Sequence, residues 1–378
     1  MRIGFDISHS VGQRSGLGAY AIGLLQGLAA VDAEDEFLVY SFFYHRYPIR
    51  WRRVSIPEKP NFILNDPLFP GPVIRHLMGT RGSARSLWGN VEIVHSNSNV
   101  APELRDSRLV FTLFDTTIYL FPETHTAANY DLVNRNLHRA ARNAAAVIAI
   151  SEQTKRDAQR FLHIPADRLF VVYPAAAKQF GPDIPADEIS RVRARYGLPR
   201  EFVLAVGTTE PRKNLNRLLE AIGLLARRGI KLPLFVAGGR GWLSEPLYEY
   251  VRRQGLGSLV TFTGYVPEND LPALYKAASV FAYPSLYEGF GLPVLEAMAC
   301  GTPTLTSNRS ALIEAAGDAA LLVNPESVTE IADGIQELID DKAKRTDLAR
   351  LGLEQSRKFS WEQSARQVLE IYRRIIKR

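Results

Sequence analysis

The sequence predicts an α/β fold made of two doubly wound domains that face a central cleft. Short apolar runs alternate with longer segments of helical periodicity, a pattern typical of parallel sheets covered by helices. This alternation stops at a polar, proline-rich stretch near residue 185 and then starts again. The chain has 378 residues. That length suits two domains, since one domain usually takes about 100–200 residues.

The first domain is predicted to cover residues 1–180. Apolar runs predict buried strands at residues 2–7, 37–43, 92–95, 109–114, 146–150 and 169–173. Apolar residues at helical spacing predict helices over residues 20–31 and 132–146. A third helix is expected to run from the N-cap Ser151 to residue 161, because a serine hydroxyl can accept a bond from the first turn.

The second domain is predicted to cover residues 195–358, after a linker at 181–187 and a short helix at 188–196. Its strands are expected at 202–206, 234–237, 260–262, 280–283, 304–306 and 320–323. Its helices are expected at 214–228, 245–254, 271–278 and 293–299. A last helix, within residues 361–378, is expected to pack back on the first domain.

The composition excludes several classes of protein. With 46% hydrophobic and 23% charged residues, the chain is an ordinary globular sequence rather than a disordered one. The apolar run at 144–150 is far shorter than the roughly 20 residues of a spanning helix. The N-terminal segment has an acidic residue, Asp6, and no long apolar stretch, so it does not resemble a signal peptide. The single cysteine, Cys300, can form neither an internal disulfide nor a metal cluster, so a cytoplasmic protein is expected.

The charge is mildly basic, with 46 Lys and Arg against 40 Asp and Glu. The net charge of +6 indicates an anionic partner but gives no specific reason to expect nucleic acid. Arginines alternate with aromatic and apolar residues in two segments, at Arg46, Arg50, Arg52 and Arg53, and at Arg75, Arg81 and Arg85. This pattern predicts peripheral association with an anionic membrane surface. Solvated loops without a partner would have the same composition.

The most informative segment, residues 283–298, follows a predicted strand. Pro293 suits a helix start, and Gly289 and Gly291 in the preceding loop let the backbone approach a ligand closely. Amide groups at a helix start attract phosphate. Carboxylates there need other donors, so Glu288 and Glu296 are predicted to accept bonds from sugar hydroxyls. Alternatively, Glu296 complements the helix dipole and Glu288 is a solvated loop residue.

A second segment, residues 207–214, also follows a strand directly. It begins with Gly207 and Thr208 and places Arg212 next to Lys213 at a predicted helix start. An arginine fork beside a lysine point charge is well suited to a diphosphate. A surface charge pair is the alternative interpretation.

Two segments of the first domain contain further candidates. Gly16 and Gly18 lie in a G-x-G-x-x-A pattern, but too far past the strand for a dinucleotide fingerprint, which predicts a flexible loop that packs against a ligand. Asp115 follows a strand and is either an acceptor-side carboxylate or a turn cap. The histidines show no metal-ligand spacing, so no bound metal is expected.

Together these segments resemble a known family. Glu288 and Glu296, in Glu-Gly-Phe-Gly-Leu-Pro-Val-Leu-Glu, resemble the paired-glutamate motif of the retaining nucleotide-sugar glycosyltransferases of family 4, which have the GT-B fold of two Rossmann-type domains. Residues 207–214 resemble the diphosphate turn of that family, and residues 264–267 its base-side loop. Residues 301–303 and 308–314 continue the match. Phe114 is a departure, because many relatives have histidine there.

The resemblance implies roles for individual residues. Arg212 and Lys213 would neutralise the diphosphate, Glu288 would hold a hexose hydroxyl and Glu296 the ribose diol. The implied catalytic set is Glu288, Arg212, Lys213 and Asp115. The implied donor-binding set is Gly16, Gly18, Gly207, Thr208, Val266, Gly289, Phe290, Gly291, Leu292 and Glu296. Such enzymes retain the anomeric configuration and use neither a metal nor another cofactor.

The resemblance also implies a substrate class. Glu-Pro-Arg-Lys-Asn at 210–214, together with Phe-Asp and Phe-Pro-Glu between 114 and 123, is similar to bacterial members assigned as mannosyltransferases. GDP-mannose is therefore the expected donor, with a UDP-sugar as the alternative. The expected acceptor is a saccharide or a lipid-linked saccharide in cell-envelope polysaccharide assembly.

Three other classes use some of the same residues. A glycoside hydrolase also needs two carboxylates, but has no use for Arg212 and Lys213 at a helix start. A nicotinamide dehydrogenase needs a tight glycine turn that the sequence does not have. A non-catalytic sugar-nucleotide sensor would share all of the binding residues, and turnover alone separates it from an enzyme.

Overall fold

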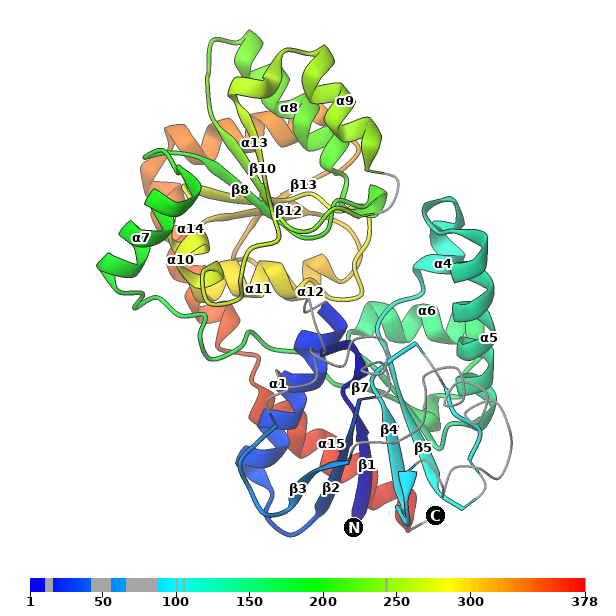
Figure 1. The fold of residues 1–378 in the computed structure, drawn as a ribbon. Helices are drawn as coiled ribbons and strands as arrows, with labels where there is room; N and C mark the ends of the chain where they lie inside the picture. Colours follow the sequence, from blue (N-terminus) through cyan, green and yellow to red (C-terminus); the bar gives the residue numbers. More distant parts are fainter. Residues whose placement is uncertain are drawn as a thin grey trace. The chain divides into compact units, whose positions relative to one another are not determined.

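The computed structural model describes residues 1–10, 16–41, 56–65, 88–99, 101–104, 106–241 and 244–377. The chain divides into two compact units, one formed by Met1–Ala175 with Phe359–Arg378 and the other by Ala176–Lys358. Each unit contains one parallel sheet with helices packed against it (Figure 1). Within the described ranges, no helix has both the length and the hydropathy that a membrane-spanning segment requires. The two arginine-rich segments lie outside these ranges, so their membrane contact stays a prediction.

The first unit has a seven-stranded sheet in the order β3-β2-β1-β4-β5-β6-β7. All neighbouring strands are parallel, with Ile3 opposite both Phe37 and Ile93. Most strand residues are buried, as expected of a parallel sheet covered on both faces. The strands are β1 (Arg2–Asp6), β2 (Glu36–Tyr40), β3 (Phe62–Asn65), β4 (Ile93–Ser96), β5 (Arg108–Leu113), β6 (Ala146–Ala149) and β7 (Leu169–Val171). The sequence did not predict β3, a short edge strand.

The helices of the first unit are α1 (Gly16–Val31), α4 (Thr117–Leu120), α5 (Ala127–Asn143), α6 (Glu152–Leu162) and α15 (Trp361–Ile376). Ser151 caps α6 as predicted, since its Oγ accepts a bond of 2.9 Å from the Thr154 amide. Helix α5 begins earlier than expected because Thr126 caps it, its Oγ1 accepting from the Asn129 amide at 3.3 Å.

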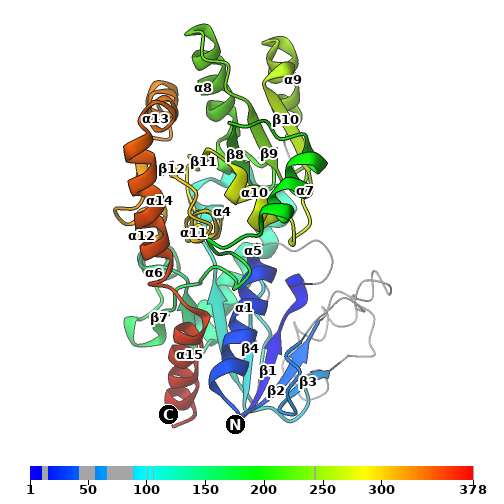
Figure 2. The ribbon, with the colours of Figure 1, turned by 90° about the vertical axis from the view of Figure 1, so that its left-hand side faces the viewer.

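The C-terminal helix α15 belongs to the first unit, where it lies beside α1 (Figures 1 and 2). Two glycines of α1 make room for it. A Cβ atom on Gly23 would come within 2.2 Å of the Trp361 indole, and one on Gly27 within 2.3 Å of the Trp361 carbonyl oxygen. The helix is also bonded to the sheet, because the Tyr372 hydroxyl lies 2.5 Å from Nδ1 of the fully buried His95. Burial lowers the pKa of His95 to about 3, so the imidazole is neutral and can accept this bond.

The second unit has a six-stranded parallel sheet in the order β10-β9-β8-β11-β12-β13. Its strands are β8 (Val203–Val206), β9 (Leu234–Ala237), β10 (Val260–Gly264), β11 (Val280–Tyr283), β12 (Thr304–Ser307) and β13 (Leu321–Val323). All six coincide with predicted strands to within a few residues.

The helices of the second unit are α7 (Ala186–Tyr196), α8 (Leu215–Arg227), α9 (Glu245–Arg253), α10 (Leu271–Ala277), α11 (Leu292–Ala299), α12 (Leu312–Ala316), α13 (Val328–Asp340) and α14 (Lys342–Ser356). Helices α8 and α13 share one buried cluster with Val280 and Ala282 of β11. Because side chains alternate along a strand, Phe281 and Tyr283 point to the opposite face of the sheet.

Helix α7 shows why the second unit begins before residue 195. Asp270, whose side chain is 4% exposed, accepts bonds from Arg191 at 2.8 Å, Arg195 at 2.9 Å and the Tyr196 hydroxyl at 2.8 Å. These bonds fix α7 to the start of α10. The segment that the sequence left as a linker is therefore part of the second unit, which starts at Ala176.

Candidate functional site

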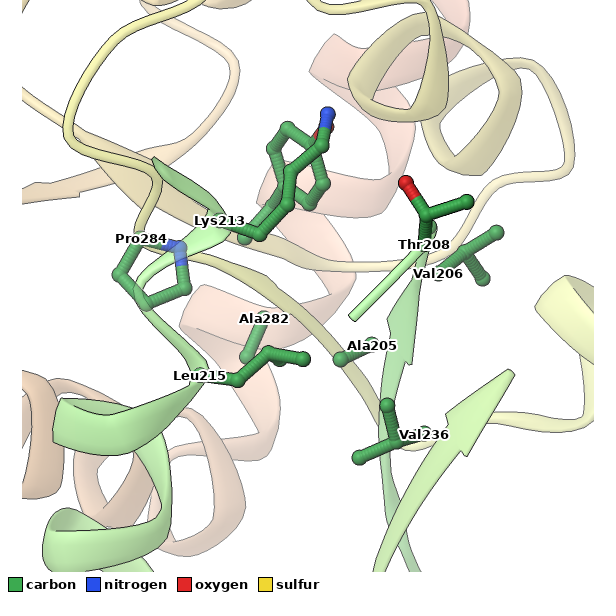
Figure 3. A pocket seen from close by; sticks show the side chains of 10 residues that line it. Ala205, Val206, Thr208, Lys213, Leu215, Val236, Ala282 and Pro284 are labelled. Carbon is green, nitrogen blue, oxygen red and sulfur yellow. The ribbon is translucent and has the colours of Figure 1, made fainter. Parts of the chain in front are cut away.

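The site of the second unit lies at the point where the order of the sheet reverses. Strands β8 and β11 are parallel neighbours, but the chain leaves them toward opposite edges of the sheet. The connections therefore diverge at their carboxyl ends, which is where doubly wound folds bind ligands. Both segments singled out in the sequence begin there. A hollow at this point is lined by Gly207, Thr208, Lys213, Tyr283 and Pro284, among others. In Figure 3 the polar ends of Thr208 and Lys213 lie away from Leu215 and Val236.

The turn after β8 is shaped by positive φ angles. Gly207 has a φ of +143°, and Asn214 has a φ of +58° just before α8 begins. Between them, Arg212 and Lys213 lie in a single 3-10 turn, Pro211–Lys213, rather than in the first turn of the helix. The buried side chain of Asn214 donates from Nδ2 to the carbonyl of Pro284 at 2.9 Å, and so joins this turn to the loop after β11. The two segments are thereby held together.

The centre of the site is a cluster of four charged side chains. Glu288 Oε1 lies 2.7 Å from Lys213 Nζ, and Glu288 Oε2 lies 2.6 Å from Arg212 Nη1. Arg212 Nη2 also donates to Glu210 Oε1 at 3.0 Å. These side chains are only 8–14% exposed, so the attraction is weakly screened. The two cations and two carboxylates balance, and the cations are fixed in place before any ligand arrives.

The charge state of Glu288 follows from this arrangement. Burial alone raises the pKa of its carboxyl, but the charges of Arg212 and Lys213 and the bonds they donate outweigh burial and lower the pKa to about 2. Glu288 is therefore ionised at neutral pH. As an acceptor-only group it can receive bonds from hydroxyl groups, which is the chemistry predicted for it.

Other residues hold the glutamates in position. The Tyr283 hydroxyl donates to Glu288 Oε1 at 2.9 Å, and the Glu288 amide donates to Ser310 Oγ at 3.1 Å. The Tyr275 hydroxyl donates to Glu296 Oε2 at 2.8 Å. Glu296 lies in α11 and Glu288 in the loop before it, as predicted.

The glycine-rich loop leads directly into α11. Gly291 has a φ of +113° and precedes the first helical residue, Leu292. A Cβ atom there would come within 2.7 Å of Leu312, so both the backbone angle and the space require glycine. The Phe290 side chain is buried, at 2% exposure. Gly289 and Gly291 are buried as well, so the contact of residues 289–292 with a donor stays a prediction.

Val266 and Thr208 occupy different positions at the carboxyl edge of the same sheet. Thr208 is exposed and lines the hollow after β8. Val266 follows β10, the strand at the far edge of the sheet, and is buried at 4% exposure. A nucleobase contact at Val266 stays a prediction.

In the first unit, the expectation of a flexible glycine loop is wrong for Gly16 and Gly18. Both residues lie in the first turn of α1. Gly18 is needed for packing, because a Cβ atom there would come within 2.3 Å of the His9 carbonyl oxygen. The sequence prediction starts the helix at Tyr20, where the apolar residues at helical spacing begin, and assigns the two glycines to the loop before it.

Asp115 closes a turn. Its Oδ1 accepts from the Thr117 amide at 3.0 Å and from the Thr117 hydroxyl at 2.5 Å, just where α4 begins. The capping interpretation therefore accounts for this residue, and its acceptor-side role stays a prediction. The neighbouring Phe114 packs edge-on against Tyr20, with ring centroids 5.2 Å apart. That position thus makes an apolar contact rather than a polar one.

The sequence is similar to those of known glycosyltransferases. The chain matches the glycosyl transferases group 1 family over residues 188–373 and glycosyltransferase family 4 over residues 14–177. It is 32% identical over 369 residues to the O-antigen chain mannosyltransferase B of Escherichia coli, an alignment that covers 95% of this chain and 96% of the relative. The chain is a family 4 glycosyltransferase.

Solved structures with the same fold include sucrose-phosphate synthase from Thermosynechococcus elongatus, with a TM-score of 0.75 at 20% identity, covering 100% of this chain and 99% of that one. Anabaena HepE in complex with UDP and glucose has a TM-score of 0.71 at 19% identity, with 98% of each chain covered. The glycosyltransferase therefore has the GT-B fold, as the sequence predicted.

Four residues of the site were missed by sequence reasoning. Glu210 stands two residues before Arg212, and that spacing could have indicated an ion pair. Tyr275, Tyr283 and Ser310 reach the glutamates only through the tertiary fold. A tyrosine at the end of a buried strand, such as Tyr283, normally indicates packing. Tyr275 within a helix and Ser310 after a strand have no spacing in the sequence that indicates a contact with a glutamate.

Proposed function

We propose that this glycosyltransferase transfers mannose from GDP-mannose to a saccharide or lipid-linked saccharide acceptor in cell-envelope polysaccharide assembly, with retention of the anomeric configuration and without a metal ion. The observation that carries the proposal is the fixed cation pair, Arg212 and Lys213, at the carboxyl ends of β8 and β11. The choice of mannose is supported by the Escherichia coli relative, which is an O-antigen chain mannosyltransferase.

The chemistry follows from the charges. The bond between the sugar C1 and the diphosphate oxygen breaks, and negative charge develops on the departing nucleoside diphosphate. Arg212 and Lys213 stabilise that charge in a site with little exposure to water, where fixed charges act strongly. The acceptor hydroxyl forms the new bond to C1 on the face that the diphosphate leaves, and a phosphate oxygen takes its proton. Glu288 accepts a hydrogen bond from a hexose hydroxyl and holds the sugar in position for this step.

A UDP-sugar donor is the second candidate. The observation that favours it is the fold shared with Anabaena HepE, whose solved complexes contain UDP-glucose or UDP with glucose. The contacts that we propose for Arg212, Lys213 and Glu288 are to the diphosphate and to a hexose hydroxyl, which both classes of donor have. The base must therefore be identified by binding.

A thermal-shift screen with GDP, UDP, ADP and their sugars tests the proposal. A ligand at 100 times its dissociation constant adds about 2.7 kcal/mol to the free energy of unfolding. We expect GDP and GDP-mannose to give the largest shifts, and Lys213→Ala to reduce them. Initial rates with GDP-mannose and a saccharide acceptor then separate an enzyme from a sensor. A larger shift with UDP would support the second candidate, and no shift with any nucleotide would refute both.

The proposal also places the protein on the cytoplasmic side of a membrane that carries the lipid-linked acceptor. The arginines of segments 45–53 and 75–85 are the contacts we propose, at about 1 kcal/mol for each basic residue near an anionic surface. Sedimentation with anionic vesicles at low salt is the measurement. Absence of co-sedimentation would leave these segments as solvated loops.

A further inference from the structure

Each of the two glutamates accepts a hydrogen bond from a buried tyrosine, and each has its own tyrosine. Tyr283, 3% exposed, donates to Glu288 at 2.9 Å, and Tyr275, fully buried, donates to Glu296 at 2.8 Å. We propose that these two phenols are separate positioning residues, Tyr283 for the sugar and diphosphate side of the site and Tyr275 for the nucleoside side. The inference rests on the proposed function, because it needs Glu288 and Glu296 to bind different parts of one donor.

The two tyrosines form one packed row with Phe281. Tyr275 of α10 meets Phe281 edge-on at 5.3 Å between ring centroids, and Phe281 stacks on Tyr283 at 5.7 Å with an angle of 18°. Phe281 and Tyr283 lie on the same face of β11 because they are two residues apart. The rings are held by these contacts, so the hydroxyl groups have fixed positions. Removing a hydroxyl therefore changes a bond to a glutamate without removing the ring.

The Tyr283 hydroxyl joins two functional groups at once. It accepts a bond from Lys213 Nζ at 2.5 Å and donates to Glu288 Oε1, and Lys213 also lies 2.7 Å from the same carboxylate oxygen. A phenol has one proton and can accept as well, so both bonds form together. Tyr283 thus fixes the distance between a cation for the diphosphate and a carboxylate for the sugar.

Both phenols stay protonated and able to donate. Burial, and then the neighbouring glutamate charge, raise the pKa of each tyrosine well above its usual value. Tyr275 differs from Tyr283 in what its hydroxyl reaches. It donates to Glu296 on α11, while its backbone carbonyl accepts from Thr302 Oγ1 at 2.8 Å, which anchors this part of α10. Loss of the Tyr275 hydroxyl should therefore change the position of Glu296 more than the positions of Arg212 and Lys213.

The test compares Tyr283→Phe with Tyr275→Phe in the full chain. Tyr196→Phe is the matched control, because it removes a phenol–carboxylate bond of 2.8 Å to Asp270 at the α7 junction. GDP binding is measured by calorimetry, and initial rates are measured with GDP-mannose, with UDP-glucose run beside it. Thermal unfolding of each variant shows whether it is folded.

We expect Tyr283→Phe to lower kcat about tenfold, because a displaced sugar loses its reactive geometry. GDP affinity should stay within about threefold, because Lys213 keeps its bond of 2.7 Å to Glu288. Tyr275→Phe should weaken GDP binding and raise KM for the donor by about three- to tenfold, the effect of one lost hydrogen bond, with kcat nearly unchanged. Tyr196→Phe should match wild type in both.

Equal losses of kcat and affinity in both site variants, or no change relative to Tyr196→Phe, would overturn the inference, since a purely structural role predicts no split. A wild-type chain that binds neither GDP nor UDP would refute the proposed function itself, and with it the separate roles of the glutamates.

Discussion

Replacing Glu288 by glutamine removes the carboxylate that Arg212 and Lys213 share. The site lowers the pKa of Glu288 from 4.5 to about 2. Since each pKa unit corresponds to about 1.36 kcal/mol, the folded protein favours the charged form by roughly 3 kcal/mol. Because the folded pKa is the lower one, this stabilisation is present above about pH 4.5 and is lost as the pH falls through about 2.

Glu288→Gln should therefore lower the free energy of unfolding by roughly 3 kcal/mol at pH 7. At about 2–4 °C per kcal/mol for a unit of this size, Tm should fall by about 6–12 °C. Thermal unfolding followed from pH 7 toward pH 3 is the assay. The deficit relative to wild type should shrink as the pH falls below about 4.5, because Glu288 then binds a proton in the unfolded wild-type chain but not in the folded protein, and glutamine cannot bind one.

GDP should stabilise the Glu288→Gln variant at least as much as wild type, because its phosphates supply the negative charge that the cations have lost. Glu337→Gln is the control. Glu337 lies 2.5 Å from Lys344, but both side chains are 35% or more exposed, so the loss should stay below about 1 kcal/mol. A Glu288→Gln variant that unfolds at the wild-type temperature at pH 7, or that binds GDP more than tenfold more weakly, would refute the reasoning.

Four further substitutions have defined outcomes. Arg212→Ala and Lys213→Ala should each weaken GDP binding about tenfold to a hundredfold, the value of a charge-assisted hydrogen bond, and calorimetry showing unchanged affinity in both folded variants would contradict the diphosphate assignment. Glu296→Ala should weaken GDP and GDP-mannose alike, whereas a loss of only about 0.3–1 kcal/mol of stability would mean that it merely complements the helix dipole. Gly23→Ala forces a methyl group against Trp361 and should lower the free energy of unfolding of the first unit by about 1–3 kcal/mol, so a wild-type Tm would argue against the α1–α15 packing.

The sequence predicted the strands of the second unit well because local and tertiary signals agree there, although it did not predict helices α12, α13 and α14. Each strand is a short apolar run, and the charged motifs directly follow the strands β8 and β11. Their proximity could be expected because β8 opens a new domain and ligand loops gather at one edge of a parallel sheet. The ion pairs of Glu288 with Arg212 and Lys213 could not be expected, since nothing in the spacing of 75 residues between Lys213 and Glu288 indicates a contact.

The first unit was harder to predict because its signals conflict. Two glycines near the start of α1 oppose a helix by intrinsic propensity, but the close approach of the His9 backbone requires glycine at position 18. Asp115 can serve as a cap or as a ligand in the same extended-to-helix context, and only the observed bonds to Thr117 identify the cap. Strand β3 is short and lies at the sheet edge, where an apolar pattern is weakest.

A crystal structure of the protein with GDP tests the central claim most directly. The account predicts phosphate oxygens within hydrogen-bond distance of Arg212 and Lys213, at the carboxyl ends of β8 and β11, with Glu296 on the ribose. Diphosphate density away from both cations, with the Glu288 ion pairs unchanged, would contradict it.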